Sequence, residues 1–352
     1  MLKWYERNDN NMPNIISSRI RLVRNCDHHE FPSRLNNRQS REMVKDLESG
    51  LKNLGVLDGR QYEFFALEGL NELDRKVLRE HWIINSTIAK KKSPAGIIVS
   101  EDESTSLILN GSDHIRMQML GSGLCLDSLW EKMNQLDDYV NERFSYAFDE
   151  KYGYLTSYPT NVGTGMRASV VLHLPALCTA KKFNSLIGEM ARFGVTVRGL
   201  YGEESYNYGA LYVVSNQKTM GITEKEIVEI VTKVAVQLNT REIQVREASL
   251  KKHRIIQEDE VYKSYGVLKY ARRMSGKDAM VFLSQLMKGI SDGLLETAEP
   301  CSIYRLMLGI KVGNLQKSSD RPLSKEELDM ERAAYIRREL PEIKVAKGDN
   351  KI

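Results

Sequence analysis

The sequence predicts an α+β fold, in which a mixed, mostly antiparallel sheet flanked by helices is followed by a small all-helical C-terminal domain. Strand-like and helix-like segments are interspersed up to about residue 245, and several strand-like segments follow one another through short turns. This arrangement is typical of antiparallel sheets rather than of doubly wound parallel ones. Strand signals nearly vanish after that point, and 352 residues exceed the ~150 of one average domain. We therefore expect two domains, at 10–246 and 247–345.

Alternating or β-branched residues predict the strands of the first domain. The clearest is 14–25, where apolar and polar side chains alternate. An acidic turn at 101–103 separates two further candidates. The predicted strands are 14–25, 95–100, 105–118, 152–158, 169–174, 195–200 and 209–215.

Apolar residues at helical spacing predict the helices. Met43, Leu47 and Leu51 recur in this way over 38–54, and Gly55 is the natural stop of that helix. Capping boxes open two helices, at 223–226 and 324–327. The predicted helices are 38–54, 70–83, 126–147, 177–193 and 223–238 in the first domain, and 257–272, 275–295, 300–309 and 324–339 in the second.

Composition excludes several classes of protein. Lys plus Arg number 51 and Asp plus Glu 47, and the net charge of +4 is too mild to indicate nucleic-acid binding. The first residues contain no apolar signal-peptide core, and no apolar run approaches the ~18 residues of a membrane span. The four cysteines are scattered without a C-x-x-C pair, which argues against a zinc site or disulfide framework. We expect a cytoplasmic protein.

Arginine in strand context is the unusual feature of the sequence. The P-loop and the catalytic loop of ordinary protein kinases are both missing. Instead, Arg19 and Arg21 are two residues apart in a strand, so both point to one face. Arg116, Arg167 and Arg198 lie in or beside other strand-like runs. Taken alone, each of these residues would be interpreted as an ordinary surface arginine. Guanidinium groups from separate strands can, however, bind a triphosphate together.

Four segments in order carry a resemblance to a known family: SSRIRLVRN at 17–25, DHIR at 113–116, PTNVGTGMRAS at 159–169 and RGLYGE at 198–203. They resemble the catalytic domain of the phosphagen (guanidino) kinases, the ATP:guanido phosphotransferase family. The resemblance covers about residues 10–245. The first segment starts at residue 17, which leaves no room for the helical domain that precedes it in free arginine and creatine kinases. This favours the McsB-type protein-arginine kinase branch, which the helical C-terminal part also fits.

The resemblance implies a set of site residues. Glu203 would hold the acceptor guanidinium, and Ser112 stands where the family has its catalytic glutamate. The residues implied to bind ATP are Ser18, Arg19, Ile20, Arg21, His81, Arg116, Arg167, Ala168, Ser169, Val170, Val171, Arg198, Gly199, Leu200, Tyr201 and Gly202. We keep a surface helix histidine as the alternative for His81 and a solvated loop acid for Glu203. Mg²⁺ would come with ATP, because Mg²⁺ commonly binds through substrate phosphates.

The acceptor side departs from the family pattern. Gly111 and Ser112 replace the two glutamates of the N-E-E-D-H motif. Arginine is protonated at neutral pH, so its phosphorylation needs a carboxylate that takes a proton, which serine cannot do. Strand alternation would send Asp113 to the opposite face, although a bulge at Gly111 would re-aim it.

Three further departures are Tyr158 in place of a cysteine, residues 204–207 after Glu203, and the C-terminal motif for binding phosphoarginine. The last appears as 328–333 without its first arginine, and it leaves Asp329, Arg332 and Ala333 as candidate phosphoarginine-binding residues. The alternative for this stretch is a solvated amphipathic helix.

The sequence thus predicts a protein-arginine kinase that transfers the γ-phosphate of ATP to arginine side chains of proteins, in stress response and protein quality control. The resemblance implies an McsA-like activator, a CtsR-like repressor, the Clp protease machinery and a homodimer. A first alternative is a catalytically impaired regulator that binds ATP or phosphoarginine. A second alternative is a nucleic-acid-binding regulator that uses basic C-terminal helices.

Overall fold

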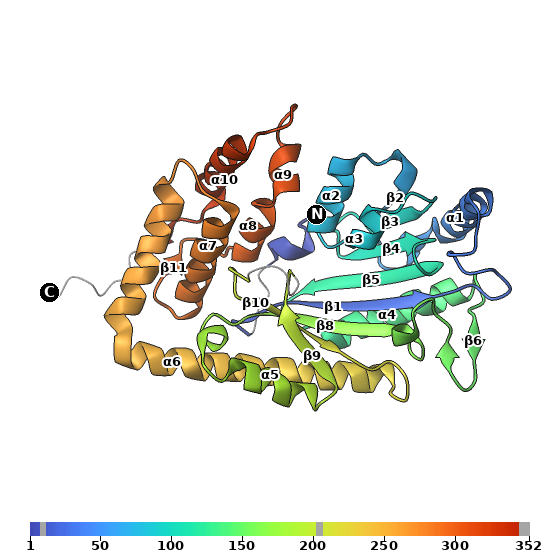
Figure 1. Ribbon diagram of the computed structural model, residues 1–352, viewed down its shortest axis with the longest axis horizontal. Helices are drawn as coiled ribbons and strands as arrows, with labels where there is room; N and C mark the ends of the chain where they lie inside the picture. The colour runs from blue at the N-terminus through green and yellow to red at the C-terminus, as the bar shows by residue number, and fades with distance from the viewer. Residues whose placement is uncertain (8–11, 202–206, 345–352) are drawn as a thin grey trace.

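The computed structural model describes residues 1–7, 12–201 and 207–344. An eight-stranded sheet in the order β2-β3-β4-β5-β1-β8-β10-β9 forms its centre, and every pairing printed for these strands is antiparallel (Figure 1). The strands are β1 (Ile15–Arg24), β2 (Tyr62–Ala66), β3 (Gly96–Ser100), β4 (Thr105–Leu109), β5 (Ile115–Ser122), β8 (Met166–His173), β9 (Val195–Gly199) and β10 (Leu211–Asn216).

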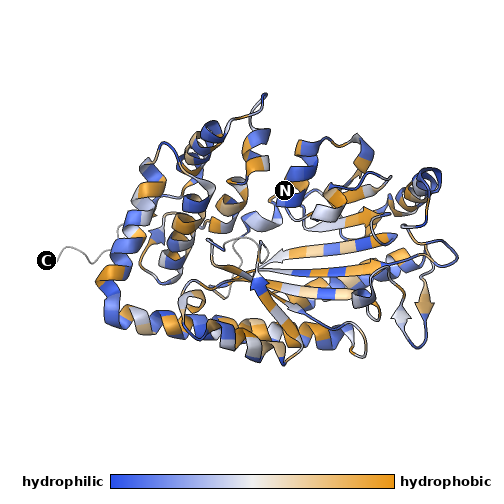
Figure 2. Cartoon of the chain, viewed as in Figure 1, coloured by the Kyte–Doolittle hydropathy of each residue, from blue (hydrophilic) through white to orange (hydrophobic). Residues whose placement is uncertain are grey.

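Helices cover one face of this sheet completely. They are α1 (Asn37–Leu51), α4 (Leu126–Asn141), α5 (Phe183–Ala191) and the first half of α6 (Glu224–Tyr270). Because side chains alternate along a strand, only every second strand residue enters this core, such as Ile20, Leu22, Ala168 and Val170, all fully buried. Figure 2 shows the same alternation of hydrophobic and hydrophilic residues along the central strands.

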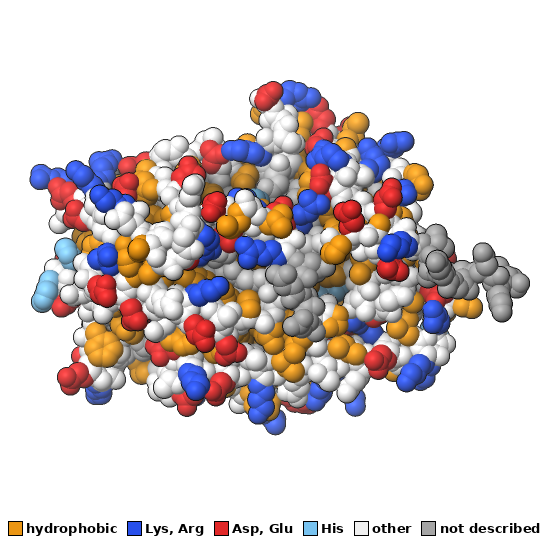
Figure 3. Space-filling model, turned by 180° about the vertical axis from the view of Figure 1, so that it is seen from behind, with side chains coloured by type: hydrophobic (Ala, Val, Ile, Leu, Met, Phe, Trp, Pro, Cys, Tyr) orange, Lys and Arg blue, Asp and Glu red, His pale blue; other side chains and the backbone are white. Residues whose placement is uncertain are grey.

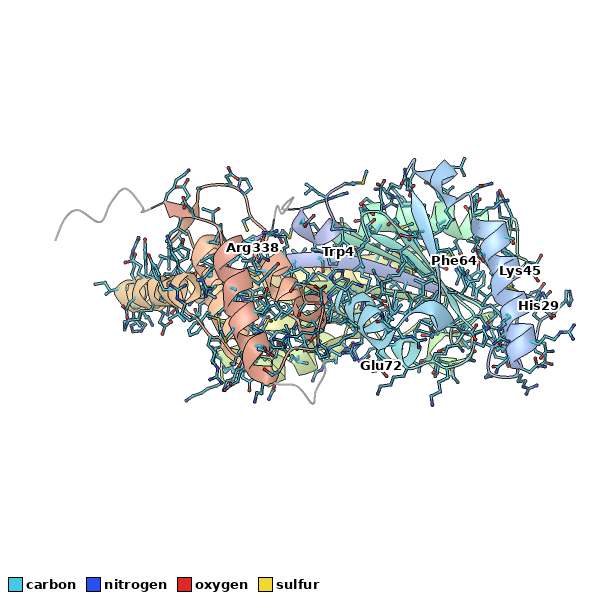
Figure 4. The ribbon with its side chains drawn as sticks, turned by 90° about the horizontal axis from the view of Figure 1, so that it is seen from above. Trp4, His29, Lys45, Phe64, Glu72 and Arg338 are labelled. Atoms are coloured by element: carbon cyan, nitrogen blue, oxygen red, sulfur yellow. The ribbon has the colours of Figure 1, made fainter. Side chains whose placement is uncertain are left out.

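The opposite face of the sheet is covered only toward its two ends. At the β2–β4 end, α2 (Glu72–Glu80) and α3 (Ser86–Ala89) bury Ile97 and Ile108. Where β5 ends and β1 and β10 begin lie the C-terminal helices α7 (Gly276–Ser291), α8 (Ile303–Gly309), α9 (Val312–Lys317) and α10 (Lys325–Glu339), whose core includes Leu120, Ile16 and Leu211. Trp4 of η1 (Trp4–Glu6) belongs to this second core, and Figure 4 shows it between the C-terminal helices and the sheet.

One long helix connects the two parts of the molecule. Helix α6 runs for 47 residues and bends at His253, whose φ of −137° and ψ of 35° are not helical (Figure 1). The predicted helices 223–238 and 257–272 are therefore two portions of one element. The boundary expected at 246 lies inside this helix, before the bend.

Several details differ from the sequence-based prediction. Residues 105–118 form a hairpin of β4 and β5 instead of one strand, and β2 and α9 had not been predicted. The segment 152–158 contributes only β7 (Gly153–Tyr154), paired with β6 (Phe148–Asp149). The C-terminal part is not all-helical, because β11 (Glu296–Thr297) pairs with β12 (Ile343–Lys344). The remaining short turns are η2 (Leu54–Leu57), η3 (Leu67–Gly69), η4 (Pro159–Asn161) and η5 (Leu177–Thr179).

No helix in the described part of the chain is both long enough and apolar enough to cross a membrane.

Candidate active site

The arginines of β1 and β8 lie side by side on the sheet. Arg21 pairs directly with Arg167, and Arg19 pairs with Ser169 two residues along. Directly paired residues of antiparallel strands point to the same face, so these four side chains share one face. The Arg19 Nε donates a hydrogen bond of 3.2 Å to the Ser169 hydroxyl.

The strand register places arginines of two more strands on the same face. Arg116 of β5 is opposite Val23, which has the same parity as Arg19 and Arg21. Arg198 of β9 is opposite Val213, and Val213 is opposite Val171, which has the parity of Arg167. Side-chain alternation therefore places five arginines on one face of the sheet, and we call them the arginine row: Arg19, Arg21, Arg116, Arg167 and Arg198. This is the face that the helices leave uncovered at its centre.

Burial and mutual repulsion destabilise the charges in this row. Burial lowers the pKa of Arg21 well below its usual value, and the charges of Arg116, Arg19, Arg167 and Arg198 lower it further. Burial, with the charge of Arg19, lowers the pKa of Arg116 to about 10. Burial lowers the pKa of Arg19 to about 10, with Tyr304 opposing and the charges of Arg198 and Arg167 adding to the effect. Burial and the charge of Arg198 lower the pKa of Arg167. A bound polyanion would relieve this repulsion.

Arg24, at the end of the same strand, shows what a structural arginine looks like here. Its guanidinium forms a 2.6 Å ion pair with Asp137, donates to the Thr164 carbonyl and lies 3.6 Å from the centre of the Tyr154 ring. By contrast, no carboxylate of residues 12–201 or 207–344 forms an ion pair with any arginine of the row. The row thus carries a concentrated positive charge that the described protein does not neutralise.

A pocket adjoins one end of the row. Its lining includes Arg21, Arg116 and Arg167 together with Gly111, Ser112, Asp113, Tyr158 and Asn161. Tyr158, the residue in place of the family cysteine, is 51% exposed and lines the pocket. The pocket therefore brings the phosphate-binding candidates together with the altered acceptor-side residues.

The loop between β4 and β5 shows that the prediction for Asp113 from strand alternation was wrong. Residues 110–114 are not part of a strand, and Asn110 adopts a left-handed φ of 53°, which asparagine tolerates better than most residues. Strand alternation therefore does not determine the direction in which the side chains of Ser112, Asp113 and His114 point. His114 is fully buried and its Nδ1 accepts a hydrogen bond from the Cys26 amide at 3.2 Å, away from the pocket lining.

An aromatic cluster lies toward the other end of the row. The rings of Trp82 and Tyr201 stack with centroids 6.2 Å apart, and the Trp82 indole donates to the Tyr304 hydroxyl at 3.0 Å. The Lys311 ammonium lies 3.7 Å from the centre of the Tyr201 ring. Three of these residues, Trp82, Tyr304 and Lys311, had not been singled out, because they come from separate segments that only the fold brings together.

His81 connects the catalytic part to the C-terminal helices. Its Nδ1 lies 2.8 Å from the Glu103 carboxylate and its Nε2 lies 2.8 Å from the Asn314 side-chain oxygen. Burial opposes the charged imidazole, but the hydrogen bonds to Glu103 and Asn314 and the charge of Glu103 outweigh it, so the pKa of His81 is raised. The preceding Glu80 accepts hydrogen bonds from the Gly313 and Asn314 amides at the start of α9.

The other strand residues of the predicted site divide by face. The side chains of Ile20, Ala168 and Val170 are buried in the helix-covered core, so only their backbone faces the row. The Ser18 hydroxyl accepts from the Cys125 amide and donates to the Gly123 carbonyl. Val171 lies on the arginine face, and Gly199 ends β9, followed by Leu200 and Tyr201. Gly202, Glu203 and residues 204–206 lie outside the described residues.

The C-terminal candidates have structural partners. Arg332 is 4% exposed and donates to Asp329 at 2.5 Å, to the Met274 carbonyl and to the Ile310 carbonyl. Ala333 is fully buried in the second core. Arg332 thus uses its guanidinium to join α10 to the segments that precede α7 and α9.

Among the described residues, no three His, Cys, Asp or Glu side chains gather at a spacing that would hold an ion. Acidic and basic side chains are mixed over the face seen in Figure 3.

Two family models match the chain. The model described as ATP:guanido phosphotransferase, C-terminal catalytic domain, matches residues 42–245. The model described as protein-arginine kinase McsB C-terminal domain matches residues 254–351. Together they cover most of the sequence and both of its parts.

Curated relatives and solved structures agree with these matches. The chain is 37% identical to a protein-arginine kinase of Halothermothrix orenii, covering 93% of each chain, and 38% identical to that of Bacillus subtilis, covering 96% of this chain and 93% of the relative. The fold resembles a lombricine kinase structure with a TM-score of 0.59 at 20% identity over 70% of each chain. It also resembles a Schistosoma mansoni taurocyamine kinase with bound transition state analog components, with a TM-score of 0.56 at 25% identity, over 67% of this chain and 34% of that one.

Proposed function

Because the chain belongs to the ATP:guanido phosphotransferase family, and within it to the protein-arginine kinases, we propose that it transfers the γ-phosphate of ATP to arginine side chains of proteins. The observation that carries the proposal is the row of five arginines, which come from four strands and share one face. No described carboxylate pairs with them. This unneutralised row is where a triphosphate would bind.

Phosphoryl transfer depends mainly on positioning and on stabilising the charge of the transferring group. Guanidinium groups suit this task, since they stay charged and donate paired hydrogen bonds to phosphate oxygens. We place the γ-phosphate at the pocket end of the row, near Arg21, Arg116 and Arg167, because the acceptor-side residues line that pocket. The rest of the nucleotide would extend along the face toward Arg19 and Arg198.

Mg²⁺ is proposed as part of the MgATP substrate. The described residues provide no cluster of protein ligands for a resident ion. Mg²⁺ is commonly bound through substrate phosphates with few protein carboxylates, so the arginine row is compatible with it.

The remaining site residues are proposed from the family resemblance. Glu203 would hold the acceptor guanidinium, and the backbone of β1, β8 and residues 199–202 would line the nucleotide site. His81 would contribute from the end of α2, where it also contacts Asn314 of α9. Asp329, Arg332 and Ala333 are proposed from the same resemblance to bind phosphoarginine, and the ion pair between Asp329 and Arg332 gives these two residues a structural role as well.

Proteins with exposed arginines are the proposed substrates. By the same resemblance we propose an McsA-like activator, a CtsR-like repressor and the Clp machinery as partners, a homodimer as the assembly, and a cytoplasmic role in stress response and protein quality control. Two domains, 10–246 and 247–345, are proposed as its functional units.

One observation favours a second candidate, an impaired enzyme that binds ATP or phosphoarginine as a regulator. Neither Gly111 nor Ser112 has an acidic side chain, although both line the pocket where the acceptor would bind. Such a protein would bind ATP tightly and transfer no phosphate.

A transfer assay separates the two candidates. The chain is incubated with γ-labelled MgATP and an arginine-rich protein, and the label on that protein is tested for stability in acid and alkali. The kinase leaves an acid-labile label, because the phosphorus–nitrogen bond of a phosphorylated guanidinium hydrolyses in acid, whereas phosphoserine and phosphothreonine esters survive it. ATP binding by calorimetry without any label on the protein would contradict the proposed function and support the regulator.

A further inference from the structure

We propose that the Asp113 carboxylate is the base that takes the proton from the acceptor arginine, in place of the acids that positions 111 and 112 lack. This inference rests on the proposed function and names a catalytic residue for it. Strand alternation predicted that Asp113 faces away from the arginines. That prediction does not apply, because residues 110–114 form the β4–β5 loop and are not in a strand.

Asp113 is the one acidic residue among the described residues that line the pocket. The same lining contains three arginines of the row, Arg21, Arg116 and Arg167. The Asp113 charge acts on Arg116, where it opposes the larger effects of burial and of Arg19 that lower the Arg116 pKa. Asp113 thus lies within electrostatic reach of the groups proposed to hold the γ-phosphate.

Hydrogen bonds fix the carboxylate through one oxygen and leave the other available. The Asp113 Oδ1 accepts from the Asn25 side-chain nitrogen at 2.8 Å and from the Ser157 amide at 2.7 Å. Asn25 is itself held, because its side-chain oxygen accepts from the His114 amide at 2.9 Å. Within residues 12–201 and 207–344, Oδ2 accepts no hydrogen bond and Asp113 forms no ion pair. A base needs this combination of a fixed orientation and a free acceptor oxygen.

The proposed reaction transfers the γ-phosphoryl group directly from MgATP to the acceptor nitrogen. The lone pair of an arginine Nη attacks the γ-phosphorus of MgATP and forms the phosphorus–nitrogen bond. The bond between the γ-phosphorus and the bridging oxygen breaks, and its electron pair leaves with MgADP. The proton lost by Nη goes to the Asp113 Oδ2 and then to solvent. The row of arginines stabilises the charge on the transferring group throughout.

Asp113→Asn tests the assignment with little disturbance of the loop. The asparagine side-chain oxygen still accepts from Asn25 and from the Ser157 amide, while an NH₂ group that cannot take a proton replaces Oδ2. Asp149→Asn is the matched control. Asp149 also accepts two amide hydrogen bonds, from Lys151 and Tyr152, but it does not line the pocket. Each variant is measured for kcat with MgATP and an arginine-rich protein, for ATP affinity by calorimetry, and for Tm.

We expect Asp113→Asn to lower kcat about 100-fold, the lower end of what a positioned base contributes. ATP affinity and Tm stay at wild-type values, and Asp149→Asn keeps full activity. Adding Ser112→Glu to Asp113→Asn returns a carboxylate to the pocket wall and recovers part of the lost rate.

Two results overturn the assignment while leaving the proposed function intact. One is an active wild type with an equally active Asp113→Asn variant. The other is a loss of rate that comes with a lower Tm and that Ser112→Glu does not reverse, since this identifies a structural role. A wild type that leaves arginine unphosphorylated contradicts the proposed function itself, and Asp113 then has no transfer to assist.

Discussion

At the scale of single residues, the chain uses arginine in two distinct ways. Arg24 is neutralised by Asp137 and lies over two aromatic rings, and its role is structural. Arg21 and Arg167, directly paired on neighbouring strands, repel each other and have no described carboxylate partner. Crowding like charges costs stability, and functional sites commonly carry such a cost.

Arg167→Ala is expected to weaken ATP transfer and to leave the fold intact. Loss of one charged donor to the transferring group should lower kcat/KM about 100-fold. Tm should stay equal or rise, because a buried like-charge repulsion is removed. Arg41→Ala, on an exposed arginine paired with Glu68, is the control and should change neither quantity. A lower Tm with unchanged kcat/KM would show that Arg167 is structural.

At the scale of secondary-structure elements, the contact between α2 and α9 involves a histidine, His81, whose charged form the fold favours. The His81 pKa is raised by Glu103 and Asn314 against the opposing effect of burial. A raised pKa means that the contribution of His81 to stability is complete below the ordinary pKa of about 6.5. It is lost as pH rises through the raised value in the folded protein.

The Tm difference between wild type and His81→Gln should therefore shrink as pH rises from about 6 to about 9. Thermal melts at several pH values check this directly. A difference that grows with pH would show that the neutral imidazole is the form that the fold stabilises.

The ion pair within α10 should matter for stability. Arg332→Ala removes the close ion-pair partner of the buried Asp329 carboxylate, which keeps only Arg273 at 3.9 Å, and removes two hydrogen bonds to carbonyl oxygens. We expect a loss of about 3–5 kcal/mol of unfolding free energy in urea titrations. Arg338→Ala on the same helix, where the side chain is exposed, should cost much less. Equal midpoints for the two variants would refute the structural role of Arg332.

Strand positions were more predictable than turns. The facing of Arg19 and Arg21 follows from alternation within one strand, which local sequence specifies. The β4–β5 loop depends on the left-handed Asn110 and on the contact of its side chain with the Pro94 carbonyl, which the local pattern does not reveal. The continuity of α6 was also missed, because strand signals nearly vanish near residue 245 and the stretch around His253 is mostly polar and exposed, so its helix was not evident from apolar periodicity.

At the scale of the whole molecule, the row of arginines joins strands that are distant in sequence. Arg19 and Arg198 are separated by most of the catalytic part, and only the register of β1, β8, β10 and β9 aligns them. The aromatic cluster likewise combines Trp82 with Tyr304 of α8. A ligand that binds this face would contact several strands of the sheet and the C-terminal helices at the same time.

Tripolyphosphate alone should therefore stabilise the protein. A ligand that binds only the folded state stabilises it by RT ln(1 + [L]/Kd), so Tm rises with ligand concentration, and salt screens the charges that attract the ligand. We expect tripolyphosphate and ATP to raise Tm at low salt, with the shift decreasing in higher salt, while adenosine has little effect. A shift with adenosine and none with tripolyphosphate would place the binding energy outside the arginine row.

The most direct test of the central claim is phosphorus NMR of MgATP mixed with the chain and an arginine-rich protein. The account predicts that a phosphorus–nitrogen resonance grows on the protein as the γ-phosphate of ATP declines, and that Arg167→Ala suppresses its growth. Unchanged ATP, or ATP converted only to ADP and inorganic phosphate, would contradict the claim that this chain phosphorylates arginine.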